Sequence, residues 1–292
     1  MAGSPILAYK AYEIEEFVDI YFYRRAGYQV ALLARAGRLS PNALSVLAGI
    51  VGALGGAFIA WPHLAWTGVG LLVLHGIIDS ADGQLARLTG QTSEFGRVLD
   101  GLAGYATHIA LYLGLVATVR ETWGLGSALA AALASGVCTA LQAQMYDYHR
   151  TAFAGYAIKG RIPTELTTPE VRGPLAAVVS AYAATQRALL GRHRAVEAAI
   201  ASRSMGGFVA AADREAYRAC FKRGIGGWNL LGDNVRRYAI AGCVFVGHPA
   251  WFMPITMGPL NLVLFVMWAH QQAADRRFLA ARGGASVHVR ET

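Results

Sequence analysis

Three aspartates lie close together in the sequence where one apolar stretch ends and the next begins. Asp79 and Asp82 are three residues apart and therefore share one face of a helix, and Asp100 lies one turn inside the following apolar stretch. Acidic groups at a membrane boundary are costly unless a cation neutralises them, so they indicate a functional site. Carboxylates together with phosphate oxygens are typical ligands of Mg²⁺. The three aspartates therefore predict a site for Mg²⁺ or Mn²⁺ beside a bound phosphate.

The residues around these aspartates are suited to a phosphate ligand. Glycines at positions 83, 90 and 96 leave room for a ligand to approach the backbone closely. Arg87 offers a planar guanidinium that can hold a phosphate at two points. Taken singly, each residue is better explained as a solvated helix end or a helix cap. Their concentration in one short segment, residues 79–104, favours a ligand site.

The composition indicates which kind of protein positions these residues. Of the 292 residues, 55% are hydrophobic and 15% are charged, whereas soluble domains carry about 25% charged residues. This composition argues against a soluble enzyme, and intrinsic disorder is excluded because it requires low hydrophobicity. The three cysteines are far apart and lack metal-ligand spacing, so neither a disulfide framework nor a zinc site is expected. The chain is expected to be a polytopic membrane protein.

Six apolar stretches are long enough, or nearly so, to cross a bilayer. They cover residues 41–60, 64–82, 96–119, 125–145, 237–252 and 254–272, and the fifth is short. The loops at 61–63, 120–124 and 246–254 together carry one basic residue, Arg120. Cytoplasmic loops are rich in Lys and Arg, so this asymmetry places both termini and the 82–96 loop in the cytoplasm of an inner-membrane protein. The net charge of +8 then faces the membrane surface and gives no support for nucleic-acid binding.

Two segments are not expected to span. Residues 10–38 combine apolar residues at helical spacing with several arginines, which predicts an amphipathic helix on the inner leaflet. Residues 146–235 form a cytoplasmic insertion with one helix from about Pro174 to Ile200 and another over 211–223. The start of the chain has no basic-then-apolar run of a cleaved signal peptide. We therefore expect five regions, with the site segment inside the second: residues 1–40, 41–145, 146–235, 236–275 and 276–292.

The segment Asp79-x-x-Asp82-Gly83-x-x-Ala86-Arg87, followed after eight residues by Gly96-x-x-x-Asp100, resembles the signature of the CDP-alcohol phosphotransferases. The Pro41-Asn42 start of the first apolar stretch is also similar to that family. The resemblance implies an all-α integral membrane protein, a six-transmembrane-helix bundle with an N-terminal amphipathic surface helix, to which this chain adds a helical cytoplasmic insertion.

The resemblance also implies a function in phospholipid biosynthesis. Such enzymes displace CMP from a CDP-linked donor, either CDP-diacylglycerol or a CDP-alcohol, with the hydroxyl of an alcohol acceptor, and homodimers are expected. By the same resemblance, Asp79, Asp82 and Asp100 bind metal. The cytidine diphosphate is bound by the same motif, through the positions Asp79, Asp82, Gly83, Ala86, Arg87 and Gly96.

One position departs from the family pattern. The pattern continues with a fourth aspartate, the proposed base, and here that position is Gly104. His108 lies on the same helix face as Asp100 and leans back over the space beside Gly104, so it is a candidate base. Packing is the other explanation of this histidine. Asp147 and Glu94 are weaker candidates. An acceptor phosphate could also take the proton, or the reaction could need no base.

The same departure keeps other functions open. The chain could be a non-catalytic relative that binds a CDP-lipid or nucleotide without turnover. A cation transporter is less consistent with the sequence, because the acidic residues gather at one membrane edge rather than at the bilayer midplane. For an enzyme, a phosphorylated polyol acceptor would suit a basic group at the cytoplasmic edge, formed by His149, Arg150, Arg236 and Arg237. These four residues could instead be anchors that reach lipid headgroups.

Overall fold

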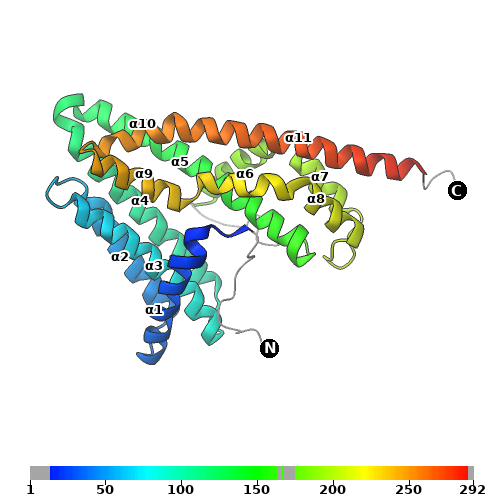
Figure 1. The fold of residues 1–292 in the computed structure, drawn as a ribbon, viewed down its shortest axis with the longest axis horizontal. Coiled ribbons are helices and arrows are strands. Elements are labelled where there is room, and N and C mark those ends of the chain that lie inside the picture. Colours follow the sequence, from blue (N-terminus) through cyan, green and yellow to red (C-terminus); the bar gives the residue numbers. More distant parts are fainter. Residues whose placement is uncertain (1–13, 164–165, 167–174, 289–292) are drawn as a thin grey trace. The chain divides into compact units, whose positions relative to one another are not determined.

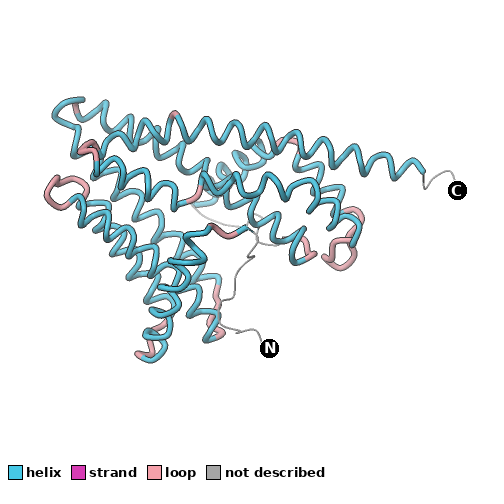
Figure 2. Tube along the Cα trace, in the orientation of Figure 1, coloured by secondary structure: helices cyan, strands magenta, loops and turns pink. Residues whose placement is uncertain are grey.

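The structure is a computed structural model that describes residues 14–163, 166 and 175–288. Every regular element in these ranges is a helix, apart from two isolated bridges, Arg161–Phe208 and Met205–Phe208 (Figure 2). The expected all-α class is confirmed. Of the expected N-terminal and C-terminal regions, residues 1–13 and 289–292 lie outside the described residues.

The chain divides into two compact units, and each is described by itself. The first unit combines residues 1–139 with 233–259, and the second combines 140–232 with 260–292. The second unit thus contains most of the expected insertion at 146–235, and also most of the last long helix. Elements of both units are labelled in Figure 1.

The first unit is built on three long helices, α2 (Pro41–Phe58), α3 (Ala65–Thr89) and α4 (Glu94–Trp123). Around them lie α1 (Arg24–Ala36), the start of α5 (Leu125–Phe153), α9 (Asp233–Phe245) and α10 (Phe252–Met257). α2 begins where the side chain of Ser40 caps the amide of Ala43 at 3.2 Å, and Pro41 occupies the first turn. Ser93 caps α4 in the same way, on the amide of Gly96 at 2.9 Å. These caps fix the helix starts beside the predicted site.

The backbone of α2 approaches α3 and α4 closely at Gly52. A Cβ atom at this position would overlap Thr107 of α4 and would lie 2.9 Å from the Nδ1 of His75 on α3. About one helical turn from this contact, one buried hydrophobic cluster joins Leu72 of α3, Leu111 of α4 and Ile240 of α9. A residue without a side chain at position 52 therefore sets the register in which α3 and α4 present their polar residues.

The second unit contains the rest of α5, the π-helix η3 (Ala154–Lys159), α6 (Leu175–Leu190), α7 (His193–Ala201), α8 (Ala211–Trp228) and most of α11 (Pro259–His288). The expected helix over 174–200 is two helices, because Gly191 adopts a φ of +52° that ends α6. The expected helix over 211–223 corresponds to α8. A buried hydrogen bond joins His193 to Asp275, with Nδ1 and Oδ1 2.7 Å apart.

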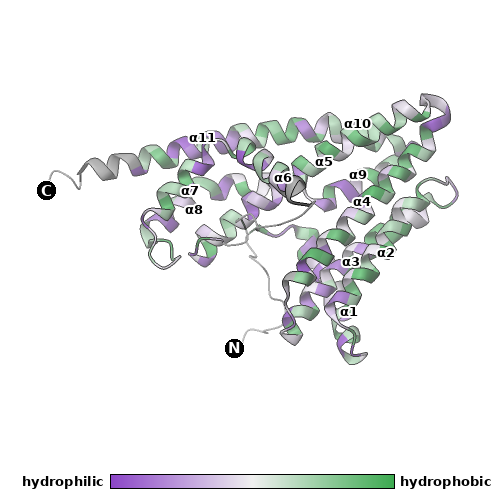
Figure 3. Ribbon diagram, turned by 180° about the vertical axis from the view of Figure 1, so that it is seen from behind, coloured by the Kyte–Doolittle hydropathy of each residue, from purple (hydrophilic) through white to green (hydrophobic). Residues whose placement is uncertain are grey.

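Within the described ranges, four segments are long and apolar enough to cross a membrane: Pro41–Phe58, Phe95–Trp123, Leu125–Lys159 and Pro249–Arg282. Hydrophobic residues run along α4, α5 and α11 in Figure 3. The expected second span lies in the 25-residue helix α3, but His75, Asp79 and Asp82 lower the hydropathy of that helix. The expected fifth span lies largely in α9, which has 13 residues. The six-span count therefore stays a prediction.

The N-terminal segment is helical where it is described. A π-helical turn at Asp19–Tyr23 leads directly into α1, which ends at Ala36. Ala31 and Ala34 of α1 are buried in a cluster with Ala81 and Leu85 of α3. Leu33, on the other side of α1, is exposed. This two-faced character agrees with the expected amphipathic helix, and its position on a membrane surface stays a prediction.

Candidate functional site

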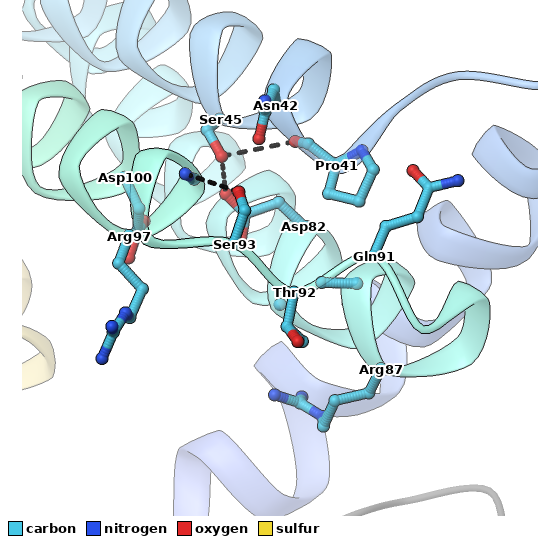
Figure 4. A pocket seen from close by; sticks show the side chains of 13 residues that line it. Pro41, Asn42, Ser45, Asp82, Arg87, Gln91, Thr92, Ser93, Arg97 and Asp100 are labelled. Carbon is cyan, nitrogen blue, oxygen red and sulfur yellow. Dashed lines mark hydrogen bonds between the residues drawn. The ribbon is translucent and has the colours of Figure 1, made fainter. Parts of the chain in front are cut away.

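A pocket of about 490 Å³ opens where α2 begins and where α3 passes into α4 (Figure 4). It contains six of the residues expected at the cytidine diphosphate and metal sites: Asp82, Gly83, Ala86, Arg87, Gly96 and Asp100. The other lining residues are Pro41, Asn42, Ser45, Gln91, Thr92, Ser93 and Arg97. Residues that the sequence placed in one short segment thus form one continuous wall.

Asp82 is held in place at the base of this wall. Its side chain is buried and accepts a hydrogen bond from the hydroxyl of Ser45 on α2 (Figure 4). The backbone carbonyl of Pro41 lies 3.3 Å from the same hydroxyl. The helix α2 therefore orients the carboxylate that α3 contributes.

The three aspartates are neighbours, although only two of them line the pocket. Asp79 lies within hydrogen-bonding reach of Asp100 and within electrostatic range of Asp82. Asp82 is also within electrostatic range of Asp100. In the part of the chain that is described, no three His, Cys, Asp or Glu side chains are already gathered at metal-ligand distances. The donor set itself, three carboxylates beside one another, fits a hard divalent cation.

Arg87 and the two motif glycines form the rest of the wall. The guanidinium of Arg87 lies against Gly83, where a Cβ atom would be 3.4 Å from its Nη1. A Cβ atom on Gly96 would be 3.0 Å from the Oδ1 of Asn42. Burial, followed by the positive charge of Arg24, lowers the pKa of Arg87. A guanidinium remains charged at any physiological pH, so the pocket keeps a cation beside its carboxylates.

Position 104, where the sequence resemblance leads to the expectation of an aspartate, faces open space. A Cβ atom on Gly104 would have no described neighbour within 4 Å. One turn further along α4, the Nδ1 of His108 lies 2.9 Å from the carbonyl oxygen of Gly104. That oxygen can only accept, so Nδ1 carries the proton and the Nε2 of a neutral imidazole is the basic nitrogen.

A second group of charges lies at the start of α9, which packs against α3. Asp233 is in the first turn, and its Oδ1 accepts a hydrogen bond of 2.9 Å from the buried Arg236. Arg237 lies 4.9 Å above the ring of Tyr23 and within electrostatic range of Asp79. Burial would raise the pKa of Asp233, but Arg236, His108 and Arg237 hold that pKa well below its usual range.

The four residues of the expected basic group have different surroundings. Arg236 is buried and bonded to Asp233, and Arg237 is partly exposed. His149 belongs to the second unit, where it is 3% exposed and stacks on Trp228 with ring centroids 4.3 Å apart. Arg150 contacts the ring and hydroxyl of Tyr146. The environment of His149 is that of a core residue.

Several pocket residues were not expected from the sequence. Neither residue type nor spacing predicts a ligand-binding role for four of the lining residues, Ser45, Thr92, Ser93 and Arg97. The one available hint is that Ser45 is a polar residue four positions after Pro41 in an otherwise apolar stretch. No local pattern points to Asp233, which lies at the end of the expected insertion at 146–235 and belongs to no motif. Of the weaker candidates for a base, Asp147 is exposed on α5, and the side chain of Glu94 lies outside the described residues.

Fold and site together define a helical membrane protein with a pocket of carboxylates, glycines and a guanidinium at the junction of α3 and α4. The family model described as CDP-alcohol phosphatidyltransferase matches residues 38–199, more than half of the chain and the whole of this pocket. The chain belongs to that family, and the expected resemblance is confirmed. Neither a search of curated proteins nor a search of solved structures found a significant match. Its family indicates a phosphotransferase of phospholipid biosynthesis.

Proposed function

We propose that this chain transfers a phosphate-linked group from a CDP-linked donor, CDP-diacylglycerol or a CDP-alcohol, to the hydroxyl of an alcohol acceptor. The observation that carries the proposal is the pocket, in which motif residues of α3 and α4 share one wall with the start of α2. Oxygen of the acceptor forms a bond to the donor phosphorus, and the bond from that phosphorus to the CMP oxygen breaks. CMP leaves with the bonding electron pair.

The donor diphosphate is the part of the substrate that the pocket would hold. Gly83 and Gly96 would admit it close to the backbone, and Arg87 would bind its oxygens through two parallel hydrogen bonds. Members of the family generally use a divalent metal ion. Asp79, Asp82 and Asp100 would hold such an ion, and when bound it supplies positive charge to the phosphate oxygens.

His108 is the proposed base. Its protonated Nδ1 is directed to the carbonyl of Gly104, which leaves Nε2 to accept the proton of the acceptor hydroxyl. The absence of a side chain at position 104 gives the acceptor space beside this nitrogen.

Arg237 is the member of the expected basic group that best suits an anionic acceptor such as a phosphorylated polyol. It is partly exposed and lies within electrostatic range of Asp79. Arg236 is buried, and we assign it to the support of Asp233. In this proposal the site faces the cytoplasm, the lipid enters from the membrane, and two copies of the chain associate.

Release of CMP is the measurement that tests the proposal. Purified protein is incubated with CDP-diacylglycerol, Mg²⁺ or Mn²⁺, and a panel of alcohols that includes phosphorylated polyols. CMP should appear only when donor, metal and a suitable acceptor are all present, and chelation by EDTA should stop it. Asp100→Ala should lose at least 1,000-fold in activity. Glu121→Gln is the matched control, because this carboxylate lies at the other end of α4 with its side chain 88% exposed.

The same assay separates the enzyme from a non-catalytic relative. Binding of CDP without CMP release from any donor and acceptor would support a nucleotide-binding protein instead. Activity that survives in Asp100→Ala would show that the chemistry occurs elsewhere.

A further inference from the structure

A partner for His108 lies at the start of α9, a helix outside the segment 79–104. Asp233 is separated from the motif by more than 130 positions in the chain. Its side chain is 56% exposed, so solvent reaches the carboxylate, although the packing of α9 against α3 partly desolvates it. Arg236 binds its Oδ1, and among the described residues no hydrogen-bond donor is found for its Oδ2.

One contact between α3 and α9 sets the level of Asp233 relative to the site. A Cβ atom on Gly76 of α3 would lie 2.9 Å from the Cζ of Arg237 on α9. Asp79 is three residues from Gly76 in the direction of the pocket, and Asp233 is four residues before Arg237. One turn of helix rises about 5 Å. Asp79 and Asp233 therefore lie about one turn from the same contact.

The packing of α4 places His108 at the level of the contact between Gly76 and Arg237, about one helical turn from Asp79 and from Asp233. Leu111, one turn from His108, shares a buried cluster with Leu72 of α3 and Ile240 of α9. Thr107 meets the same point of α2 as His75, which is one turn before Asp79. His108 and Asp233 are within electrostatic range of each other, and so are Asp233 and Asp79.

From this placement we propose that Asp233 and His108 together replace the carboxylate that position 104 lacks. His108 accepts the proton of the acceptor hydroxyl through Nε2, and Asp233 stabilises the imidazolium that forms. Asp233 is therefore a positioning and charge-stabilising residue that acts through His108. This inference rests on the proposed function, because it concerns the proton that leaves the acceptor.

Electrostatics favour this division of roles. A carboxylate held by Arg236 and Arg237 remains ionised and is a weak base, but it is a permanent negative charge for a nearby cation. Histidine is the side-chain type that most often transfers protons in enzymes, so His108 suits this step. The titratable and charged groups around this space are His75 and Asp79 of α3, Asp100 and His108 of α4, Asp233, Arg236 and Arg237 of α9, and Tyr23 beside Arg237.

An acidic residue in the first turn of a helix also stabilises that helix through its dipole. The test must therefore separate a charge that acts on His108 from one that only supports α9. Asp233→Asn keeps a side chain that caps helices well and removes the charge. Asp233→Glu keeps the charge and serves as the rescuing variant.

The first experiment is the pH profile of kcat/KM for CMP release. Asp233→Asn should lower kcat/KM about 10- to 100-fold and move the acidic limb of the profile to lower pH, because loss of a nearby anion lowers the pKa of an imidazole. Asp233→Glu should restore most of the lost kcat/KM and should return the acidic limb toward its wild-type pH. In a His108→Ala background, Asp233→Asn should cause no further loss.

The second experiment needs no activity. Isotope-labelled imidazoles are titrated by NMR, and the signal of His108 is assigned by its absence from His108→Ala. The midpoint pH of the His108 titration should be lower in Asp233→Asn than in the wild type, and it should be unchanged in Glu121→Gln. An unmoved midpoint, or equal losses with and without His108, would overturn the inference while CMP release by the wild type upheld the function. Absence of CMP release would reject the function, and the titration would still decide whether the two residues are coupled.

Discussion

Ser45 of α2 and Asp82 of α3 form a buried hydrogen bond that joins two helices at the base of the pocket. The hydroxyl of Ser45 donates to Oδ2 of Asp82, and the two residues are 4% and 7% exposed. A carboxylate that accepts such a bond keeps one orientation, because its desolvated oxygen has a fixed donor. The geometry of the pocket therefore depends on a residue outside the segment 79–104.

Replacement of Ser45 by alanine should weaken the protein in two ways. Loss of a hydrogen bond to a buried charged group costs about 1.5–3 kcal/mol of unfolding free energy. The KM for the CDP-linked donor should also rise several-fold, because Asp82 loses its orientation. Thermal unfolding in detergent and initial-rate kinetics measure the two effects. Ser202→Ala is the control, since that exposed hydroxyl bonds only to its own helix, at Ala199. Equal losses in both variants would contradict the prediction.

Binding of the donor should depend on the planar guanidinium of Arg87 and not only on the positive charge of this residue. Arg87→Lys keeps a cation but cannot form two parallel hydrogen bonds to a phosphate, so KM for the donor should rise about tenfold or more. Arg120→Lys, an exposed residue at the far end of α4, should change nothing. A wild-type KM in Arg87→Lys would mean that this side chain does not bind the diphosphate.

Local sequence was sufficient to bring together most residues of the pocket wall. The spacing of Asp79 and Asp82 on one helix face, and of Gly96 and Asp100 at the start of the next helix, led to residues that share one wall. This succeeded because each pair lies within a turn or two of a single helix. The division of α3 and α4 at the cap on Ser93 also follows from nearby residues.

The rest of the site depends on contacts between distant segments. Ser45 and Asp233 come to the site only because α2 and α9 pack against α3, and no local pattern specifies that packing. The break at Gly191 was missed because one glycine in a helical pattern is often tolerated. Conversely, the second expected span carries the polar residues of the site, so the same residues that mark function lower its hydropathy.

The charge of Asp233 should make a pH-dependent contribution to stability. Burial raises its pKa, but Arg236, His108 and Arg237 outweigh this and depress the pKa. A group with a depressed pKa stabilises the folded state above its unfolded pKa, about 3.9 for aspartate, and loses that contribution as the pH falls further. The difference in Tm between wild type and Asp233→Asn should therefore be largest near neutral pH and shrink below about pH 4. A difference that stays constant down to pH 3 would contradict this.

Replacement by alanine should change the stability of the protein in opposite directions at two glycines on facing helices. At Gly52 a new Cβ atom meets Thr107 and His75, so Gly52→Ala should cost about 1–3 kcal/mol through overpacking. At Gly104 the added atom meets open space, so Gly104→Ala should gain up to about 1 kcal/mol from helix propensity.

Gly104→Asp extends this comparison to function. The open space at position 104 can hold a carboxylate on the same helix face as Asp100 and His108. The variant should fold and should recover part of the CMP release that is lost in His108→Ala, because the new carboxylate can accept the proton directly. Thermal unfolding and the kcat of the double variant test this. A Gly104→Asp protein that folds but restores nothing to His108→Ala would show that position 104 does not face the reacting hydroxyl.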